Sequence, residues 1–377
     1  MNDKKTLLPI TLGMLLSTVP ALSDATGSSD SIQGQIDSLR TKTVQGTYVG
    51  KTPGFLNGPG FYFNADFIYW KPDEDGLEYA YKFKSLNNVT PNFVQNGRLE
   101  DVDFEYEPGF RLGAGWTTNY DEWDVYACWT WLHASASDHA HNHQPGVDVL
   151  VPLWFPVQLA LTNNFQRSAE SASGHWHLHY NVLDVNLGRK YFVSKAISLR
   201  PHFGLRTAWI DQHFNNSFKG LDYSSSRATH FHGKNDFWGI GLRTGINLQF
   251  FFNKNWSMYA NGSGSLLYGD FDLSHTVKGF DPSNPTNYTR LYHEKEDNHR
   301  LRTNLEVGAG FTWETFFHQD RYHFSLSAGW DFVEWFNQNE LRKFIGYQNP
   351  DLGAGTYLVE DGDLGLQGFT LSARFDF

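Results

Sequence analysis

The sequence is poor in the features that many folded or exported proteins depend on. Its 377 residues include one cysteine, Cys128, so no disulfide can form within the chain, and a packing role is expected for it. Charged residues make up 19% of the chain, below the usual share of about 25%. Beyond the N-terminus there is no apolar run of the ~20 residues that a membrane-spanning helix requires. These scarcities exclude a disulfide-stapled domain and a bundle of spanning helices.

Positive charge is scarce as well. Lys and Arg number 30 against 41 Asp and Glu, which gives a formal net charge of -11. Nucleic-acid-binding proteins present a basic surface, so nucleic acid is excluded as a partner.

Catalytic and metal-binding motifs are also missing. Ser, His and Asn are plentiful, but none forms a recognisable nucleophile motif, and the Gly-x-Gly pieces precede no helix. The histidines of 139–143 fall in an expected outer loop, and those of 175–179 alternate along one strand face. No Cys pair or carboxylate at a ligand spacing accompanies them, so a solvated, titratable cluster is expected rather than a metal site. We therefore expect no enzyme activity, no cofactor and no bound metal.

The N-terminus has the pattern of an export signal. Lys4 and Lys5 precede the uncharged stretch 6–19, and small residues follow up to Ser23. A basic region, an apolar region and small residues before a cleavage point are typical of a secretory signal peptide. Residues 1–23 are therefore predicted to be removed on export.

Residues 24–59 are rich in Ser, Gly and Thr. Ile32, Ile36 and Leu39 recur at helical spacing, which is compatible with one short helix. The preferred interpretation is an N-terminal periplasmic arm. A periplasmic coiled coil and a plug inside the barrel are the alternatives.

The chain is rich in aromatic residues, 16% of the total, and from Gly60 onward its polar and apolar residues alternate. In 367–377, Phe369, Leu371 and Phe375 fall on one face and Arg374 on the other. A period of two is typical of strands with one polar and one apolar face. Ten such segments are clear: 60–70, 103–117, 121–134, 174–189, 197–211, 235–252, 255–270, 299–316, 321–336 and 364–377.

The links between these segments alternate in length. Long links cover 71–102, 135–173, 212–234, 271–298 and 337–363, and the four other links are short. Short periplasmic turns alternating with long outer loops are typical of outer-membrane β-barrels, as are aromatic girdles at both interfaces. We therefore predict an all-β, antiparallel transmembrane β-barrel over 60–377, located in the bacterial outer membrane, with both of its ends on the short-turn side.

The long links could contain further hairpins. Alternation continues in 77–83 and in parts of 341–358, so we predict 12 strands within a range of 10 to 16. Segment 146–162 is apolar but contains two prolines, so it is expected as a loop that packs into the barrel mouth. In 174–189 the apolar parity switches at Val182–Leu183, which predicts a β-bulge there.

Four stretches resemble one protein family. They are FYFNADFIYWKPDEDGLEYAY (61–81), PGFRLGAGW (108–116), LDVNLGRKYFVSKAISLRPHFGLRTAWIDQ (183–212) and the closing LSARFDF. In this order and spacing they are similar to the Legionella-type major outer membrane proteins, which have relatives among chlamydia-like bacteria. The resemblance covers about residues 60–377 and implies a porin-like outer-membrane barrel. Because the cysteine-rich chlamydial pattern is absent, a disulfide-linked envelope lattice is not implied.

Charges on the polar parity would line the lumen of such a barrel. The predicted pore-lining residues are Arg111, Arg200, His202, Arg206, Arg243, Arg302, Arg374, Glu306 and Glu314. The same parity carries the acids Asp66, Asp103, Glu105, Glu107, Asp124 and Asp184. Opposed charges in a narrow aqueous lumen set ion selectivity, so at least two of the arginines are expected at a constriction. The alternative is that the charges form ion pairs that only brace a polar interior.

The expected function is that of a porin for passive diffusion of small hydrophilic solutes and ions. The alternative is a surface adhesin or structural barrel with a filled lumen, because barrels of about eight strands leave no channel. Expected partners are outer-membrane lipid, the solutes, and the barrel-assembly machinery, for which Phe375 and Phe377 would be the signal. A homotrimer and a host surface are partners that the sequence leaves open.

Overall fold

The computed structural model describes residues 60–84, 97–118, 123–142, 148–155, 168–221, 227–281, 284–318, 321–345, 356–359 and 362–377. The chain divides into two compact units, Met1–Gly46 and Thr47–Phe377, and every described residue belongs to the second. The predicted signal peptide (1–23) and arm (24–59) therefore lie outside the described residues. Among the described residues no helix is long and apolar enough to cross a membrane.

All regular structure in the described residues is β-strand. The strands are β1 (Gly60–Glu74), β2 (Ala80–Lys84), β3 (Gly97–Glu100), β4 (Glu107–Thr117), β5 (Trp123–His141), β6 (Asp148–Pro152), β7 (Ser171–Arg189), β8 (Tyr191–Phe192), β9 (Ile197–Lys219), β10 (Ala228–Phe251), β11 (Trp256–Asp281), β12 (Asn284–Phe317), β13 (Tyr322–Asn339), β14 (Arg342–Ile345), β15 (Thr356–Val359) and β16 (Gly362–Asp376).

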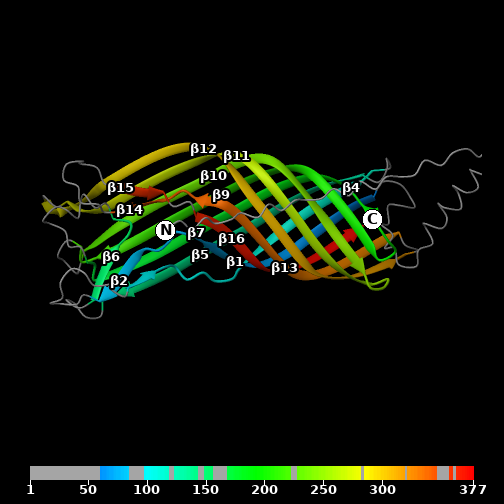
Figure 1. Ribbon diagram of the computed structural model, residues 1–377, viewed down its shortest axis with the longest axis horizontal. Coiled ribbons are helices and arrows are strands. Elements are labelled where there is room, and N and C mark those ends of the chain that lie inside the picture. Colours follow the sequence, from blue (N-terminus) through cyan, green and yellow to red (C-terminus); the bar gives the residue numbers. More distant parts are fainter. Residues whose placement is uncertain are drawn as a thin grey trace, which may run out of the picture. The chain divides into compact units, whose positions relative to one another are not determined.

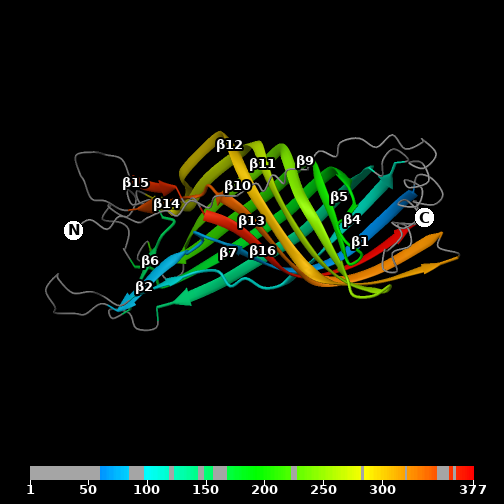
Figure 2. The same ribbon diagram turned by 45° about the vertical axis from the view of Figure 1, so that its right-hand side comes forward.

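Ten of these strands close an antiparallel barrel in the order β1-β4-β5-β7-β9-β10-β11-β12-β13-β16, with β16 paired to β1 (Figures 1 and 2). Two hydrogen bonds hold the end of this seam between β1 and β16. The Phe61 amide donates to the Phe377 carbonyl at 3.0 Å, and the Phe377 amide donates to the Phe61 carbonyl at 2.9 Å. The all-β barrel prediction is confirmed, and each of the ten clear segments contributes one barrel strand. The predicted count of 12 was too high, although ten lies within the stated range.

The remaining strands lie outside the barrel wall. β8 pairs only with β9, while β2, β3 and β6 form a three-stranded sheet and β14 and β15 form a hairpin. Figures 1 and 2 place β2, β6, β14 and β15 at the end of the barrel opposite the C-terminus. We call this end the loop end and the opposite one, where β4–β5, β7–β9, β10–β11 and β12–β13 connect, the short-turn end.

Two of the expected long links are mostly strand. β9 continues to Lys219 and β10 begins at Ala228, while only two residues separate the ends of β11 and β12. The β5 strand likewise includes His139 and His141, which were expected in a loop. Toward the far ends of these strands the outward residues become polar. The sequence therefore becomes less hydrophobic, although the backbone hydrogen bonds between the strands continue. The sequence pattern therefore marked the end of the lipid-facing band and not the end of the strands.

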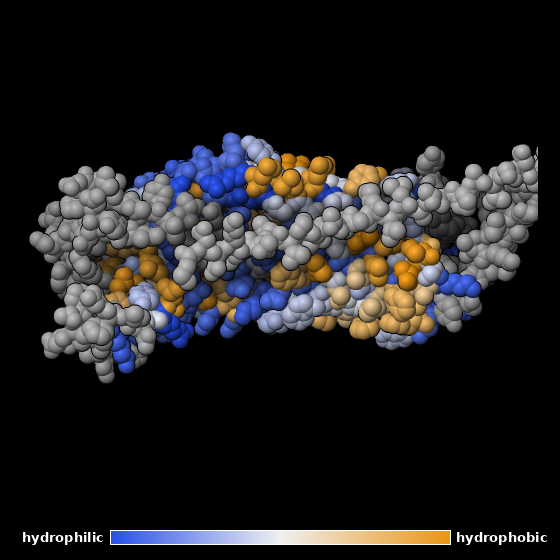
Figure 3. Space-filling model, in the orientation of Figure 1, coloured by the Kyte–Doolittle hydropathy of each residue, from blue (hydrophilic) through white to orange (hydrophobic). Residues whose placement is uncertain are grey.

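The outward face near the short-turn end is apolar. Its exposed side chains include Phe63 and Phe67 on β1, Leu205 on β9 and Leu242 on β10, the last with 72% of its surface exposed. In Figure 3 hydrophobic residues gather toward the right, and hydrophilic residues gather at the upper left, over β11 and β12. Such an apolar outer band is the surface that a transmembrane barrel presents to lipid.

Two local expectations need correction. β7 pairs with β5 and β9 in continuous register and has no bulge at 182–183. Instead Trp176 to Val182 place their apolar side chains inside, and Leu183 and Val185 place theirs outside. Asp103 and Glu105, expected to face inward on a strand, are exposed in the segment before β4.

The apolar segment near 146–162 is described only as far as residue 155. Its part Asp148–Pro152 forms β6, which pairs with β2, so a strand stands where a loop was expected. Trp154 is fully buried, and its ring centre lies 5.1 Å from that of Phe214 and 5.0 Å from that of Phe231. Both phenylalanines point inward from β9 and β10, so packing of this segment into the barrel mouth is confirmed.

Candidate functional site: the barrel lumen

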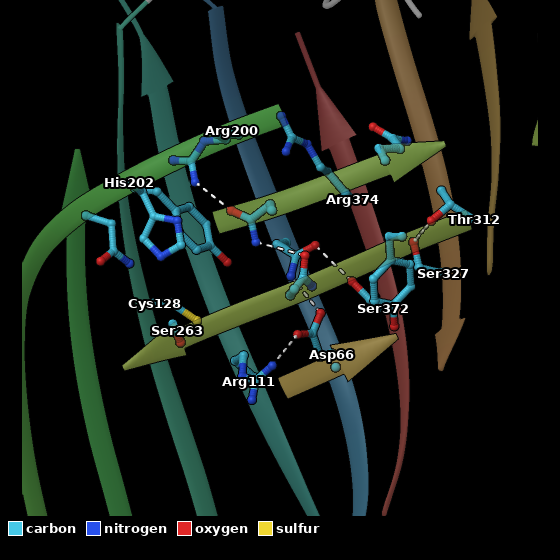
Figure 4. Close-up of a pocket in the computed structure, with 18 of the residues that line it drawn as sticks. Asp66, Arg111, Cys128, Arg200, His202, Ser263, Thr312, Ser327, Ser372 and Arg374 are labelled. Carbon is cyan, nitrogen blue, oxygen red and sulfur yellow. Dashed lines mark hydrogen bonds and ion pairs between the residues drawn. The ribbon is translucent and has the colours of Figure 1, made fainter. Parts of the chain in front are cut away.

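The short-turn half of the barrel encloses a polar chamber of about 430 Å³. Side chains from all ten barrel strands line it, because each strand turns alternate residues inward. Figure 4 shows Asp66, Arg111, Arg200, His202 and Arg374 among the side chains that project into it.

Eight of the nine predicted pore-lining residues border this chamber. They are Arg111, Arg200, His202, Arg206, Arg243, Arg374, Glu306 and Glu314. The ninth, Arg302, also points inward but lies nearer the loop end, where it is buried and paired with Glu340. Strand parity therefore identified which charges face the interior, while the chamber's extent depends on packing across the barrel.

Four charged groups in the wall form one connected network. The Arg206 guanidinium donates to both carboxylate oxygens of Asp184, with Nε–Oδ1 at 2.6 Å and Nη2–Oδ2 at 2.7 Å. Its Nη1 lies 2.6 Å from Glu306 Oε1, and Arg243 Nη2 lies 2.5 Å from the other oxygen of Glu306. Such bidentate, buried pairs fix both partners in position. Glu306 thus connects β9 and β10 to β12 from inside the lumen.

Toward the short-turn end, Asp124 of β5 accepts hydrogen bonds from two side chains. Arg200 Nη2 donates to its Oδ2 at 2.6 Å, and the Tyr62 hydroxyl donates to the same oxygen at 2.8 Å. At the same rim Arg374 Nη2 donates to Asp376 Oδ1 at 2.6 Å, and His323 Nδ1 lies 2.7 Å from Asp376 Oδ2. The closing strand is therefore tied to β13 by side chains as well as by its backbone.

Arg111 completes the set of paired arginines. Its Nη1 lies 3.7 Å from Asp66 Oδ2 and 3.5 Å from Asp331 Oδ2, on two other strands. Each of the six predicted lumen arginines thus has at least one carboxylate partner inside the barrel. This arrangement matches the bracing alternative, in which the charges hold the wall together.

Toward the loop end the interior changes from polar to aromatic. Six large side chains that are fully or almost fully buried form what we call the aromatic layer: Trp70, Trp176, Tyr180, Phe237, Phe271 and Trp335. They come from β1, β7, β10, β11 and β13 and belong to one continuous hydrophobic core.

The aromatic layer makes contact across the full width of the lumen. Trp335 Nε1 donates to the Tyr180 hydroxyl at 3.2 Å. β13 and β7, which carry these residues, are five strands apart in either direction around the ten-stranded barrel, so they face each other. Gln212 of β9 likewise donates to Glu74 of β1 at 2.9 Å. These contacts cross the lumen on the loop-end side of the chamber.

This layer was not predicted from the sequence. Its signal was the parity switch in 174–189, together with Phe237 and Trp335 on the parity that is otherwise polar. Aromatic residues on the lumen side of a strand fill a barrel of this size.

The other predicted features are placed as follows. Phe375 and Phe377 are exposed at the short-turn rim, where Phe377 stacks with Phe61 at 6.4 Å between ring centres. Cys128 is a buried free thiol in the chamber wall. Within the described residues no group of three or more His, Cys, Asp or Glu side chains is arranged to hold a metal ion.

Comparison with known proteins identifies the family. Residues 57–377 match the family described as Legionella pneumophila major outer membrane protein precursor. The chain belongs to this family. Together with the barrel, membership places the protein in the bacterial outer membrane. No curated protein matches the sequence.

Solved barrels are similar only at the level of architecture. The outer membrane protease OmpT from Escherichia coli matches with 9% identity and a TM-score of 0.35, over 84% of this chain and 96% of that one. A major outer membrane protein from Thermus thermophilus gives 11% and 0.26, over 85% and 99%. The P. putida toluene transporter TodX gives 9% and 0.26, over 86% and 91%. Likeness at these scores does not bear on function.

Proposed function

We propose that this protein is a structural outer-membrane barrel with a filled lumen, which presents its loop end at the cell surface. The observation that carries the proposal is the Trp335–Tyr180 contact between facing strands, within the aromatic layer. A hydrophilic solute would have to displace buried aromatic side chains to pass. The pairing of all six lumen arginines supports the same conclusion, because none is left to attract a solute.

The family description supports this role in a second way. A major protein of the outer membrane, as the family is described, suits a protein that contributes bulk and rigidity to the envelope. The proposed partners are outer-membrane lipid, the barrel-assembly machinery and, through the loop end, host surfaces. We propose no catalytic activity for it.

The second candidate is the porin expected from the sequence. The charged chamber of about 430 Å³ favours it, because a chamber of this kind would serve as the inner vestibule of an ion path. In that case the aromatic layer would have to move aside.

Purified protein in planar bilayers and in sugar-loaded liposomes distinguishes the two candidates. The filled barrel predicts no stepwise conductance and no swelling in small sugars, from protein whose folding is verified by its β-sheet circular dichroism. Reproducible steps together with size-dependent swelling would establish the porin instead.

A further inference from the structure

A group of histidines lies on the outward faces of β5 and β7, nearer the loop end than the apolar band. We call the following residues the histidine patch: His133, His139 and His141 on β5, and His175, His177 and His179 on β7. The rings of His133 and His179 stack with their centres 4.0 Å apart, and those of His175 and His177 lie 4.1 Å apart. Serines occupy the outward positions between and beyond them, so these stretches of β5 and β7 carry no outward carboxylate.

The charged neighbours of the patch are few. On β9, Asp211 lies opposite His179 and His213 lies opposite His177. The Asp236 carboxylate of β10 has two other partners, since Lys234 Nζ lies 2.5 Å from its Oδ2 and His213 Nε2 lies 3.5 Å from its Oδ1. Asp138 points inward, where it accepts a hydrogen bond from the Tyr79 hydroxyl, and Arg98 pairs with Glu100. The charged groups near the edges of the patch are Lys82, Arg98, Glu100, Asp138, Glu170 and Lys219. Among the described residues, Asp211 is thus the one acid in register with a patch histidine on a neighbouring strand.

The depth of the patch follows from the strand register. Trp131 of β5 lies opposite Asn181 of β7, which lies opposite Trp209 of β9, and Trp209 lies opposite Trp238 of β10. We call these three tryptophans the tryptophan row. Tryptophans at the edge of an apolar band mark the membrane–water interface. His133 is two residues beyond Trp131, which is ~7 Å along the strand and ~5 Å along the membrane normal for a strand tilted by about 45°. The patch therefore begins in the lipid headgroup layer.

We propose that the histidine patch binds the phosphate groups of outer-leaflet lipids when its imidazoles are protonated. At neutral pH most imidazoles are uncharged, since the ordinary pKa of histidine is about 6.5. Below that pH protonated imidazoles of the patch place positive charge opposite the headgroups. A lipid phosphate then meets a basic surface at the depth where such groups lie.

The local environment sharpens this response. Burial, followed by the charge of His179, lowers the pKa of His133, and burial followed by its neighbouring histidines lowers that of His177. These two imidazoles therefore become charged below the ordinary histidine pKa. A bound phosphate favours the imidazolium form and raises those pKa values, so binding must tighten as the pH falls.

The proposal depends on the membrane placement of the barrel and not on whether its lumen conducts. The test uses the full-length mature protein in dodecyl maltoside with EDTA present, and a fluorescent short-chain phosphatidic acid as the probe. We expect the probe to bind about tenfold or more tightly at pH 5.0 than at pH 7.5. In H133Q/H175Q/H177Q/H179Q, which keeps two of the six patch histidines, the affinity at pH 5.0 should fall most of the way to the pH 7.5 value, because glutamine keeps the polarity but does not titrate.

The matched control is H293Q/H299Q on β12, which removes two exposed outward histidines, of which His299 pairs with Asp270. It should keep the full pH dependence. Equal affinity at both pH values, or an unchanged pH response in the quadruple variant, would overturn the proposal. Equal competition by inorganic phosphate on a molar basis would overturn the assignment to lipid. Bilayer conductance of the same preparations tests the proposed function separately.

Discussion

The two halves of the barrel have opposite polarity. Near the short-turn end the outward residues, such as Leu205 and Leu242, are apolar and the inward residues, such as Arg206 and Asp184, are charged. Toward the loop end the outward residues of β7 are His and Ser, and the interior holds aromatic and aliphatic side chains together with buried polar groups such as Gln212 and Glu74. The first arrangement suits a lipid surround and the second suits water. One continuous set of strands is thus a membrane barrel at one end and a water-facing barrel at the other.

The boundary between the halves lies at the tryptophan row of Trp131, Trp209 and Trp238. On β7 and β10 the aromatic layer lies beside this row, since Tyr180 and Phe237 directly neighbour it along their strands. On these two strands the buried aromatic side chains therefore lie close to where the strands leave the lipid. This comparison predicts how substitutions in the two halves should differ.

The largest expected effect comes from opening the seal. Trp335→Ala removes a fully buried side chain that crosses the lumen, which should cost about 3–5 kcal/mol of folding free energy. It should also connect the chamber to the loop end, so liposomes that carry it should swell in small sugars when wild-type liposomes do not. Trp330→Ala, which removes an exposed outward residue of the same strand, is the control and should not swell. If both variants behave like wild type, the seal is formed elsewhere.

The next effect concerns the charged half. Arg206→Met leaves Asp184 without its closest partner and removes one of the two arginines that pair with Glu306 in a buried wall, which should destabilise the barrel by about 3–5 kcal/mol. Arg98→Met breaks an ion pair whose arginine side chain is 82% exposed, so it should change stability by less than about 0.5 kcal/mol. Urea titration of the two variants in lipid vesicles measures the difference. Equal losses would mean that the lumen charges do not brace the wall.

The polarity inversion itself can be tested on the outer surface. Leu242→Arg places a charge within the apolar band and should cost about 2–4 kcal/mol. His213→Arg places the same side chain outward beyond the tryptophan row and should be close to neutral. The pair is compared by urea unfolding in vesicles. A large loss for His213→Arg would move the membrane boundary toward the loop end.

The smallest effect on the folded barrel is expected at the seam. Phe377→Asp removes an exposed aromatic residue that stacks on Phe61, so the stability of the inserted barrel should change little. Delivery to the outer membrane should fall, because a terminal aromatic residue is the proposed assembly signal. Surface labelling of cells that express the variant measures this. Normal surface levels would remove Phe377 from that role.

The sequence was sufficient to predict the barrel, its ten clear strands and the direction of its charges. Those features depend on a period of two, which is local and which Arg200, His202 and Arg206 on β9 show directly. The contacts across the lumen could not be predicted in the same way. Trp335 and Tyr180 are 155 positions apart in the sequence. Their contact depends on the diameter of the barrel, which is set by its ten strands, where twelve were predicted. The strands were predicted too short for a related reason, since the backbone hydrogen bonds between them continue beyond the point where the outward residues stop being hydrophobic.

The seam between β1 and β16 has a consequence for the order of folding. The indole of Trp70 donates to the Thr370 hydroxyl at 3.1 Å across a separation of 300 positions. The β13–β16 pairing joins strands that are neighbours in the sequence, but the β1–β16 pairing joins the first barrel strand to the last and must wait for residues 362–377. Contacts of such high sequence separation are slow to form, because a long loop must close before they gain any energy. The unfinished sheet keeps two open edges until that moment, so a chaperone that shields strand edges would act chiefly on this intermediate.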